Sequence, residues 1–129
     1  MDPVDLLVFG PHPDDLELGL GGSIARHGDL GLRVGLCDLT AGEMGSNGTV
    51  EERLAEAEAA RVVLGAAWRV NLRWPDRAIG SSPEHVRTAA ALIRAAYAEN
   101  PTLTVLDVAK LTGASAHVTA QIRRLLVRE

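Results

Sequence analysis

The chain has 129 residues, of which 47% are apolar and only 3% aromatic, and it carries a formal charge of −4. This length fits about one domain, and its core must be built from aliphatic side chains. The net charge argues against a general nucleic-acid binder, although Arg123, Arg124 and Arg128 make the C-terminal end locally basic. The single cysteine, Cys37, excludes an internal disulfide and indicates a reducing compartment.

The distribution of apolar residues also bears on the compartment. No segment approaches the ~20 apolar residues that a membrane-spanning helix needs. The N-terminal region carries Asp2 and Asp5 rather than a basic segment, so a signal peptide is not predicted. We therefore expect a cytoplasmic protein.

The first half of the chain predicts two strands joined by a helix. Val4 to Phe9 is a short apolar run ended by a Gly-Pro pair, which is typical of a buried parallel strand. Residues 16–28 follow with apolar residues near helical spacing, and their glycines permit close packing. Residues 32–39 predict the second strand, and the polar, glycine-rich segment 40–49 after it predicts a functional loop.

The second half continues the same alternation. Thr49 and Glu52 have the spacing of a capping box, which predicts a helix through Leu64. Residues 68–72 predict a third strand. A helix then starts with proline at its first helical position and is expected over residues 83–98.

The predicted order βαβαβα indicates an α/β fold. We expect a Rossmann-like parallel sheet with right-handed crossovers, helices on both faces and a helical C-terminal tail. We place the boundary between the first domain and this tail at residues 97 and 98. A sheet cut after three strands would leave an open apolar edge, so we also expect a homo-oligomer.

The residues after the first strand carry the strongest chemical signal. His12, Asp14 and Asp15 follow the predicted strand tip, where open α/β sheets usually bind ligands. His12 and Asp15 are suitable ligands for Zn²⁺, and a neighbouring carboxylate such as Asp14 can take a proton from water as a catalytic base. The alternative is a loop of turn-forming residues in which Asp15 only caps the next helix.

Several spaced motifs together resemble one known family. They are residues 4–22 around the His-Pro-Asp-Asp element, residues 37–49, Arg53 with Glu56, residues 60–65, and residues 71–77 with their Pro-Asp-Arg element. These motifs resemble the LmbE/PIG-L zinc deacetylases, and the Ser-Asn-Gly-Thr and Pro-Asp-Arg elements are most similar to the bacillithiol-biosynthesis branch. The resemblance covers about residues 4–95.

The resemblance implies an activity and a set of site residues. Such enzymes remove the acetyl group from an N-acetylglucosamine unit that is linked to a small molecule such as malate or inositol. His12 and Asp15 would then be zinc ligands and Asp14 the general base. Glu43, Arg53, Asp76 and Arg77 would lie near the sugar and its acidic substituent. The alternatives are a solvated helix charge beside Glu56 for Arg53, and an ordinary loop charge for Arg77.

The resemblance stops where the family would supply its third zinc ligand. The family's second motif, His-Pro-Asp-His, is not found after residue 95. His117 lies at a suitable distance along the chain but lacks the flanking motif, and a histidine at a helix start is commonly a surface or capping residue. We therefore expect a metal site that is one recognisable ligand short and an enzyme that is truncated or impaired.

The tail resembles a different module. Residues 104–115 and 117–126 have the spacing of a helix-turn-helix, with Gln121, Arg123 and Arg124 on its second helix. The alternatives are two ordinary amphipathic helices over the sheet edge, or a fourth strand at residues 103–108. Two functions remain open: a zinc-dependent N-deacetylase, or a non-catalytic regulator or fusion whose tail binds DNA or a protein partner.

Overall fold

The computed structural model describes residues 2–80 and 82–97. The elements are β1 (Leu6–Gly10), α1 (Asp15–Asp29), β2 (Val34–Thr40), α2 (Val50–Val63), β3 (Trp68–Trp74) and α3 (Pro83–Ala96). The predicted βαβαβα order is confirmed. The predictions for His117, the helix-turn-helix, the alternative fourth strand and the tail domain concern residues 98–129, and they lie outside the described residues.

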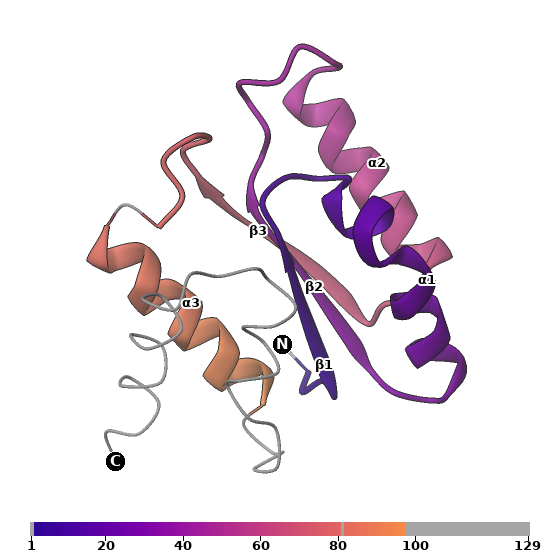
Figure 1. Ribbon diagram of the computed structural model, residues 1–129. Coiled ribbons are helices and arrows are strands. Elements are labelled where there is room, and N and C mark those ends of the chain that lie inside the picture. The colour runs from indigo at the N-terminus through magenta and orange to yellow at the C-terminus, as the bar shows by residue number, and fades with distance from the viewer. Residues whose placement is uncertain (1, 81, 98–129) are drawn as a thin grey trace.

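The three described strands form a parallel sheet in the order β1-β2-β3. Because all three run the same way, their carboxyl ends meet at one edge of the sheet, toward the top of Figure 1. The strands β2 and β3 approach closely at Gly35, which pairs with Trp68. A Cβ atom at Gly35 would lie 2.5 Å from the indole ring of Trp68, so only glycine fits there.

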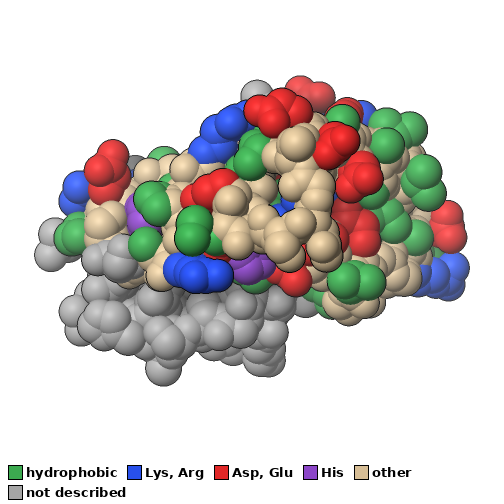
Figure 2. Space-filling model, turned by 90° about the horizontal axis from the view of Figure 1, so that it is seen from above, with side chains coloured by type: hydrophobic (Ala, Val, Ile, Leu, Met, Phe, Trp, Pro, Cys, Tyr) green, Lys and Arg blue, Asp and Glu red, His purple; other side chains and the backbone are tan. Residues whose placement is uncertain are grey.

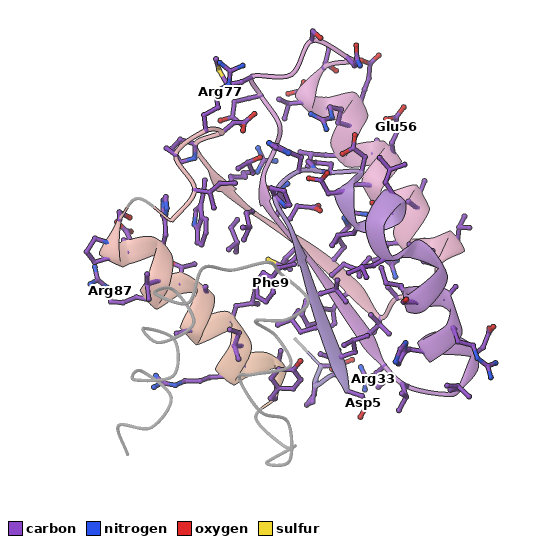
Figure 3. The ribbon with its side chains drawn as sticks, viewed as in Figure 1. Asp5, Phe9, Arg33, Glu56, Arg77 and Arg87 are labelled. Carbon is purple, nitrogen blue, oxygen red and sulfur yellow. The ribbon has the colours of Figure 1, made fainter. Side chains whose placement is uncertain are left out.

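Helices cover both faces of this sheet, as predicted (Figure 1). One face packs against α1, with Val8 and Leu36 of the sheet against Leu16 and Ile24 of the helix. α2 lies beside α1 on that face. The other face packs against α3, and Figure 3 shows Phe9 between β1 and this helix. Alternate residues of β1 thus enter two separate apolar cores, as a strand buried on both faces requires.

The strand boundaries differ from the predicted ones for reasons of main-chain hydrogen bonding. β1 starts at Leu6, because the N–H of Val4 donates to the carbonyl of Ala96 at the end of α3 instead of joining the sheet. β2 starts at Val34, because the N–H of Leu32 closes the turn after α1 by donating to His27. The predicted strands therefore began too early, because apolar residues that pack beside the sheet look the same in the sequence as apolar residues within it.

The predicted helix start at Thr49 is confirmed as a full capping box. The hydroxyl of Thr49 accepts from the N–H of Glu52 at 3.1 Å, and the carboxylate of Glu52 accepts from the N–H of Thr49 at 2.8 Å. Ser82 caps α3 in a similar way, since its hydroxyl accepts from the N–H of His85 at 3.2 Å. Across residues 2–80 and 82–97, no helix has the length and apolar character to cross a membrane.

Candidate functional site

An open pocket of about 560 Å³ lies at the carboxyl ends of the strands. Figure 2 looks down on this end of the molecule, where acidic, basic and histidine side chains gather around loop backbone. The pocket lining includes five residues of the predicted site: His12, Asp14, Arg53, Asp76 and Arg77. The loop of residues 44–47 and Glu56 of α2 complete it. Residues from three loops and one helix, far apart in sequence, therefore face one space.

His12 lies between two carboxylates. Its Nδ1 is 3.2 Å from Oδ2 of Asp15, and its Nε2 is 2.9 Å from Oδ1 of Asp76. Burial works against the protonated form of His12, but the hydrogen bonds and charges of Asp76 and Asp15 outweigh it, so the pKa of His12 lies above its usual 6.5. The imidazole orientation is thus fixed from both edges of the ring.

Asp15 is the first residue of α1, and its carboxylate turns back toward His12. Its Oδ2 also accepts the main-chain N–H of His12 at 3.0 Å. The position before the helix belongs to Asp14, whose side chain makes no capping hydrogen bond. The alternative prediction, that Asp15 acts as the cap of this helix, is therefore wrong.

Asp14 has a backbone conformation that L-residues rarely adopt. Its φ is 111°, in the region that favours glycine, although it carries a side chain. The side chain is 61% exposed, and Oδ2 lies 3.4 Å from Nη2 of Arg53. This conformation separates the directions of Asp14 and Asp15, so that the former lines the pocket while the latter binds His12.

Arg53 joins the two loops that follow β1 and β2. From the first turn of α2 its Nη2 donates to the carbonyl of Pro13 at 2.7 Å and its Nη1 donates to the carbonyl of Gly42 at 3.0 Å. The side chain is only 15% exposed, so the alternative of a solvated charge beside Glu56 is wrong. A Cβ atom at Gly42 would lie 1.9 Å from Nη1, which makes glycine necessary for this contact.

The loop after β3 is tied to the other two through Asp76. The N–H of Asp76 donates to Oε1 of Glu43 at 2.6 Å, and Oδ1 of Asp76 accepts from the N–H of Arg77 at 2.8 Å. The hydrogen bond from His12, helped by the N–H groups of Arg77 and Met44, lowers the pKa of Asp76 below its ordinary value. Glu43 and Arg77 are exposed, and Figure 3 shows Arg77 at the same end of the molecule as Glu56.

The donor atoms of His12 and Asp15 fit part of a zinc site. Two ligand atoms bound to one zinc ion at ~2.0–2.2 Å and at a tetrahedral angle lie roughly 3.4 Å apart. The 3.2 Å between Nδ1 of His12 and Oδ2 of Asp15 is close to this separation. Asp76 contacts the other ring nitrogen, which points away, so one metal ion would not bridge all three residues. Among the described residues no cluster of three or more metal-binding side chains occurs.

One buried group behind the pocket was not predicted from the sequence. Arg69 of β3 binds Asp38 of β2 and Glu17 of α1. The sequence signal for this group was one charged residue inside each of two predicted strands, Asp38 and Arg69. A buried strand tolerates such a residue only when its charge is paired.

Comparison with known proteins places the chain in a family. The family model described as "PIG-L: GlcNAc-PI de-N-acetylase" matches residues 7–122, which is most of the 129 residues. The chain belongs to the PIG-L family. The match extends past the boundary predicted between residues 97 and 98.

Individual relatives agree with this assignment. The chain is 35% identical over 71 residues to an uncharacterized deacetylase, YaiS, of Escherichia coli K12, covering 55% of this chain and 38% of the relative. It is 49% identical to the conserved protein TT1542 of Thermus thermophilus, with a TM-score of 0.67, covering 71% of this chain and 42% of that one.

Two further solved structures share the fold. The N,N'-diacetylchitobiose deacetylase of Pyrococcus horikoshii, in complex with its inhibitor MPG, is 29% identical with a TM-score of 0.64, covering 70% of this chain and 36% of that one. GalB, a 4-carboxy-2-hydroxymuconate hydratase of Pseudomonas putida KT2440, is 21% identical with a TM-score of 0.66, covering 97% of this chain and 57% of that one, and supports the fold alone. The chain thus spans less than half the length of the deacetylase relatives it matches.

Proposed function

We propose that the chain carries the catalytic half-site of a zinc-dependent deacetylase that acts on an N-acetylglucosamine conjugate. The observation that carries this proposal is the pocket, whose lining brings the carboxylate of Asp14 together with His12, Arg53, Asp76 and Arg77. Membership of the PIG-L family and the deacetylase names of two relatives support the same reaction class.

In this proposal His12 and Asp15 would hold the metal together with a ligand outside the described residues, for which His117 is the candidate. When bound, zinc acts as a Lewis acid that polarises the acetyl carbonyl and makes water a better nucleophile. The remaining chemistry belongs to side chains. The carboxylate of Asp14 takes a proton from water as the water oxygen bonds to the acetyl carbon. The carbon–nitrogen bond then breaks and the nitrogen takes up that proton, which gives the free amine and acetic acid. The acid loses the second proton of the water to solvent and departs as acetate.

Substrate recognition is assigned to the basic side of the pocket. Arg77 is exposed at its rim and is suited to a carboxylate on the group linked to the sugar, because a guanidinium donates paired hydrogen bonds. Glu43, Arg53 and Asp76 hold the loops around the sugar. A small acid such as malate would match this pocket, as in the bacillithiol-biosynthesis branch that the sequence resembles.

The test combines metal content with acetate release. Purified chain, loaded with zinc, is assayed on N-acetylglucosaminyl malate and on the neutral N,N'-diacetylchitobiose. We expect stoichiometric zinc, faster release from the acidic conjugate, and a loss of 100-fold or more, on the order expected for a general base, in Asp14→Asn. Asp29→Asn, an exposed carboxylate at the far end of α1, is the charge-matched control.

Two further results would separate the parts of the proposal. His117→Ala should abolish stoichiometric zinc if His117 is the third ligand. If the wild-type chain binds no zinc and releases acetate from neither substrate, the proposed activity is rejected. Faster release from the neutral substrate would reject only the acidic specificity assigned to Arg77.

A further inference from the structure

A buried guanidinium between the sheet and the helices α1 and α2 joins four elements of the fold. Arg69 on β3 forks onto Asp38 of β2, with Nε and Nη2 each 2.8 Å from one carboxylate oxygen. Nη1 donates to the main-chain carbonyl of Ala57 in α2 at 3.0 Å. Nη1 and Nη2 also donate to the carboxylate of Glu17 in α1, the latter bond at 3.4 Å. These five contacts match the five N–H donors of an arginine.

The centre of this network is closed to solvent. The side chains of Arg69 and Asp38 are 4% and 1% exposed. Burial works against the charge of Arg69, but the hydrogen bonds that it donates to Asp38 and Glu17, together with the charges of these carboxylates, outweigh it and raise the pKa of Arg69 above its ordinary value. A buried ion pair is a poor source of net stability, because desolvation offsets much of the attraction. The effect that remains is geometric, since a forked arginine fixes the positions of its partners.

Both carboxylates lie next to the loop that carries His12. Glu17 is in the first turn of α1, the turn that begins with Asp15 and follows Asp14. Asp38 lies two residues before Thr40, whose N–H and hydroxyl both donate to the carbonyl of Pro11, at 3.0 and 2.9 Å. The network therefore supports residues 11–17 from both ends, although its central guanidinium does not line the pocket.

We propose that Arg69, through Glu17 and Asp38, is a positioning residue that holds the first turn of α1 and so sets the direction of the Asp14 and Asp15 carboxylates. The inference rests on the proposed function, because its consequence for zinc concerns the ligand pair of His12 and Asp15. Without Arg69 the carboxylate of Glu17 would lose the guanidinium that ties it to the sheet. The first turn of α1 would then open locally, and zinc would have to restore its geometry on binding.

Arg61 offers a matched control on the same side of the sheet. It too forks onto a glutamate, Glu58, and donates to a main-chain carbonyl, that of Ala66. None of these partners lies in the pocket. The test therefore compares Arg69→Met with Arg61→Met, and the milder Glu17→Ala with Glu58→Ala.

The first measurement is local and independent of activity. The N–H of Leu18 donates to the carbonyl of Asp14 at 3.0 Å, so its hydrogen exchange reports opening of the first turn. The N–H of Tyr97, which donates to Ile93 at the end of α3, is the reference amide on the other face. In Arg69→Met and in Glu17→Ala we expect Leu18 exchange to accelerate ~10-fold relative to Tyr97, and no relative change in the two control variants.

The second measurement is the affinity of each variant for zinc by competition with a chelating dye. We expect about 10-fold weaker binding in Arg69→Met and Glu17→Ala, and a change within about twofold in the controls. If Arg69→Met does not fold, Glu17→Ala decides both measurements. Unchanged relative exchange and unchanged zinc affinity in a folded variant would overturn the inference. If the wild-type chain binds no zinc, that result rejects the proposed function instead. The relative hydrogen exchange of the Leu18 N–H then decides the inference alone.

Discussion

Nε2 of His12 lies 2.9 Å from Oδ1 of Asp76, although 64 positions separate the two residues in the chain. This contact uses the ring nitrogen that faces away from Asp15, so Asp76 orients the imidazole without competing for the same nitrogen. A carboxylate in this relation to a metal-binding histidine fixes the ring and raises its basicity.

The first prediction follows from that contact. Asp76→Ala should weaken zinc binding by roughly 10- to 100-fold, because His12 loses the partner that orients it. Zinc affinity is measured by competition with a chelating dye. Asp29→Ala removes a carboxylate far from the pocket and should leave the affinity within about twofold. Equal losses in both variants would mean that only net charge matters.

The second prediction concerns the backbone of Asp14. Because its φ of 111° is costly for a residue with a side chain, Asp14→Gly should be more stable than Asp14→Ala by about 1 kcal/mol. Urea unfolding gives the difference. At Asp29, the last residue of α1, the order should reverse, because alanine is favoured over glycine in a helix. Equal stability of the two Asp14 variants would argue against strain at this position.

The third prediction separates a steric clash from backbone strain. Gly42 and Gly65 have similar φ values of 65° and 69°, but only at Gly42 would a Cβ atom meet another group, Nη1 of Arg53 at 1.9 Å. Both alanine variants should lose about 1 kcal/mol or more to backbone strain. Gly42→Ala should lose additional stability and also displace Arg53, which lowers acetate release in the assay described above. Gly65→Ala should leave the specific activity of the folded protein unchanged, and a similar loss of activity in both would contradict the clash.

The fourth prediction is a pH dependence that arises in the capping box. Hydrogen bonds from the N–H and hydroxyl of Thr49 hold the pKa of Glu52 below its ordinary 4.5. A carboxyl group with a depressed folded-state pKa contributes stability that is fully present above its unfolded-state pKa and is lost as the pH falls through the folded-state value. Wild type should therefore exceed Glu52→Gln in urea stability at pH 7, and the difference should shrink progressively below about pH 4.5.

Glu51 provides the control for this pH series. It lies in the same first turn of α2 but makes no capping contact with Thr49. Glu51→Gln should show a smaller pH-dependent difference from wild type. A Glu52→Gln difference that stays constant from pH 7 to pH 3 would show that the ionised carboxylate of Glu52 does not stabilise the cap.

Local rules explain why much of the fold and part of the site could be predicted from the sequence. The Gly-Pro pair after the first strand and the Thr49–Glu52 spacing act over a few residues, and they placed the His12 loop and the start of α2. Contacts between distant segments could not be predicted in this way. The pairing of Arg69 with Asp38 depends on the register of two strands, and the contact between His12 and Asp76 depends on how two loops close.

Arg53 shows the same limit at a single residue. The resemblance predicts that Arg53 lies near the sugar, and in the structure its side chain lines the pocket. The sequence could not indicate that its guanidinium would engage the carbonyls of Pro13 and Gly42, because main-chain acceptors leave no pattern of residue types. Its contact with substrate stays a prediction, and the same holds for Glu43, Asp76 and Arg77.

The parallel direction of the strands has a consequence for access to His12. Two helices lie on one face of the sheet, and the chain then crosses to the other face, where the N–H of Val4 meets the end of α3 just before β1. The loops after all three described strands meet at the carboxyl edge of the sheet, and the pocket lies among them without removing any side chain from the core. Entry of a ligand at His12 is therefore a property of chain connectivity, and substitutions that enlarge or reduce core side chains should alter stability long before they close that entrance.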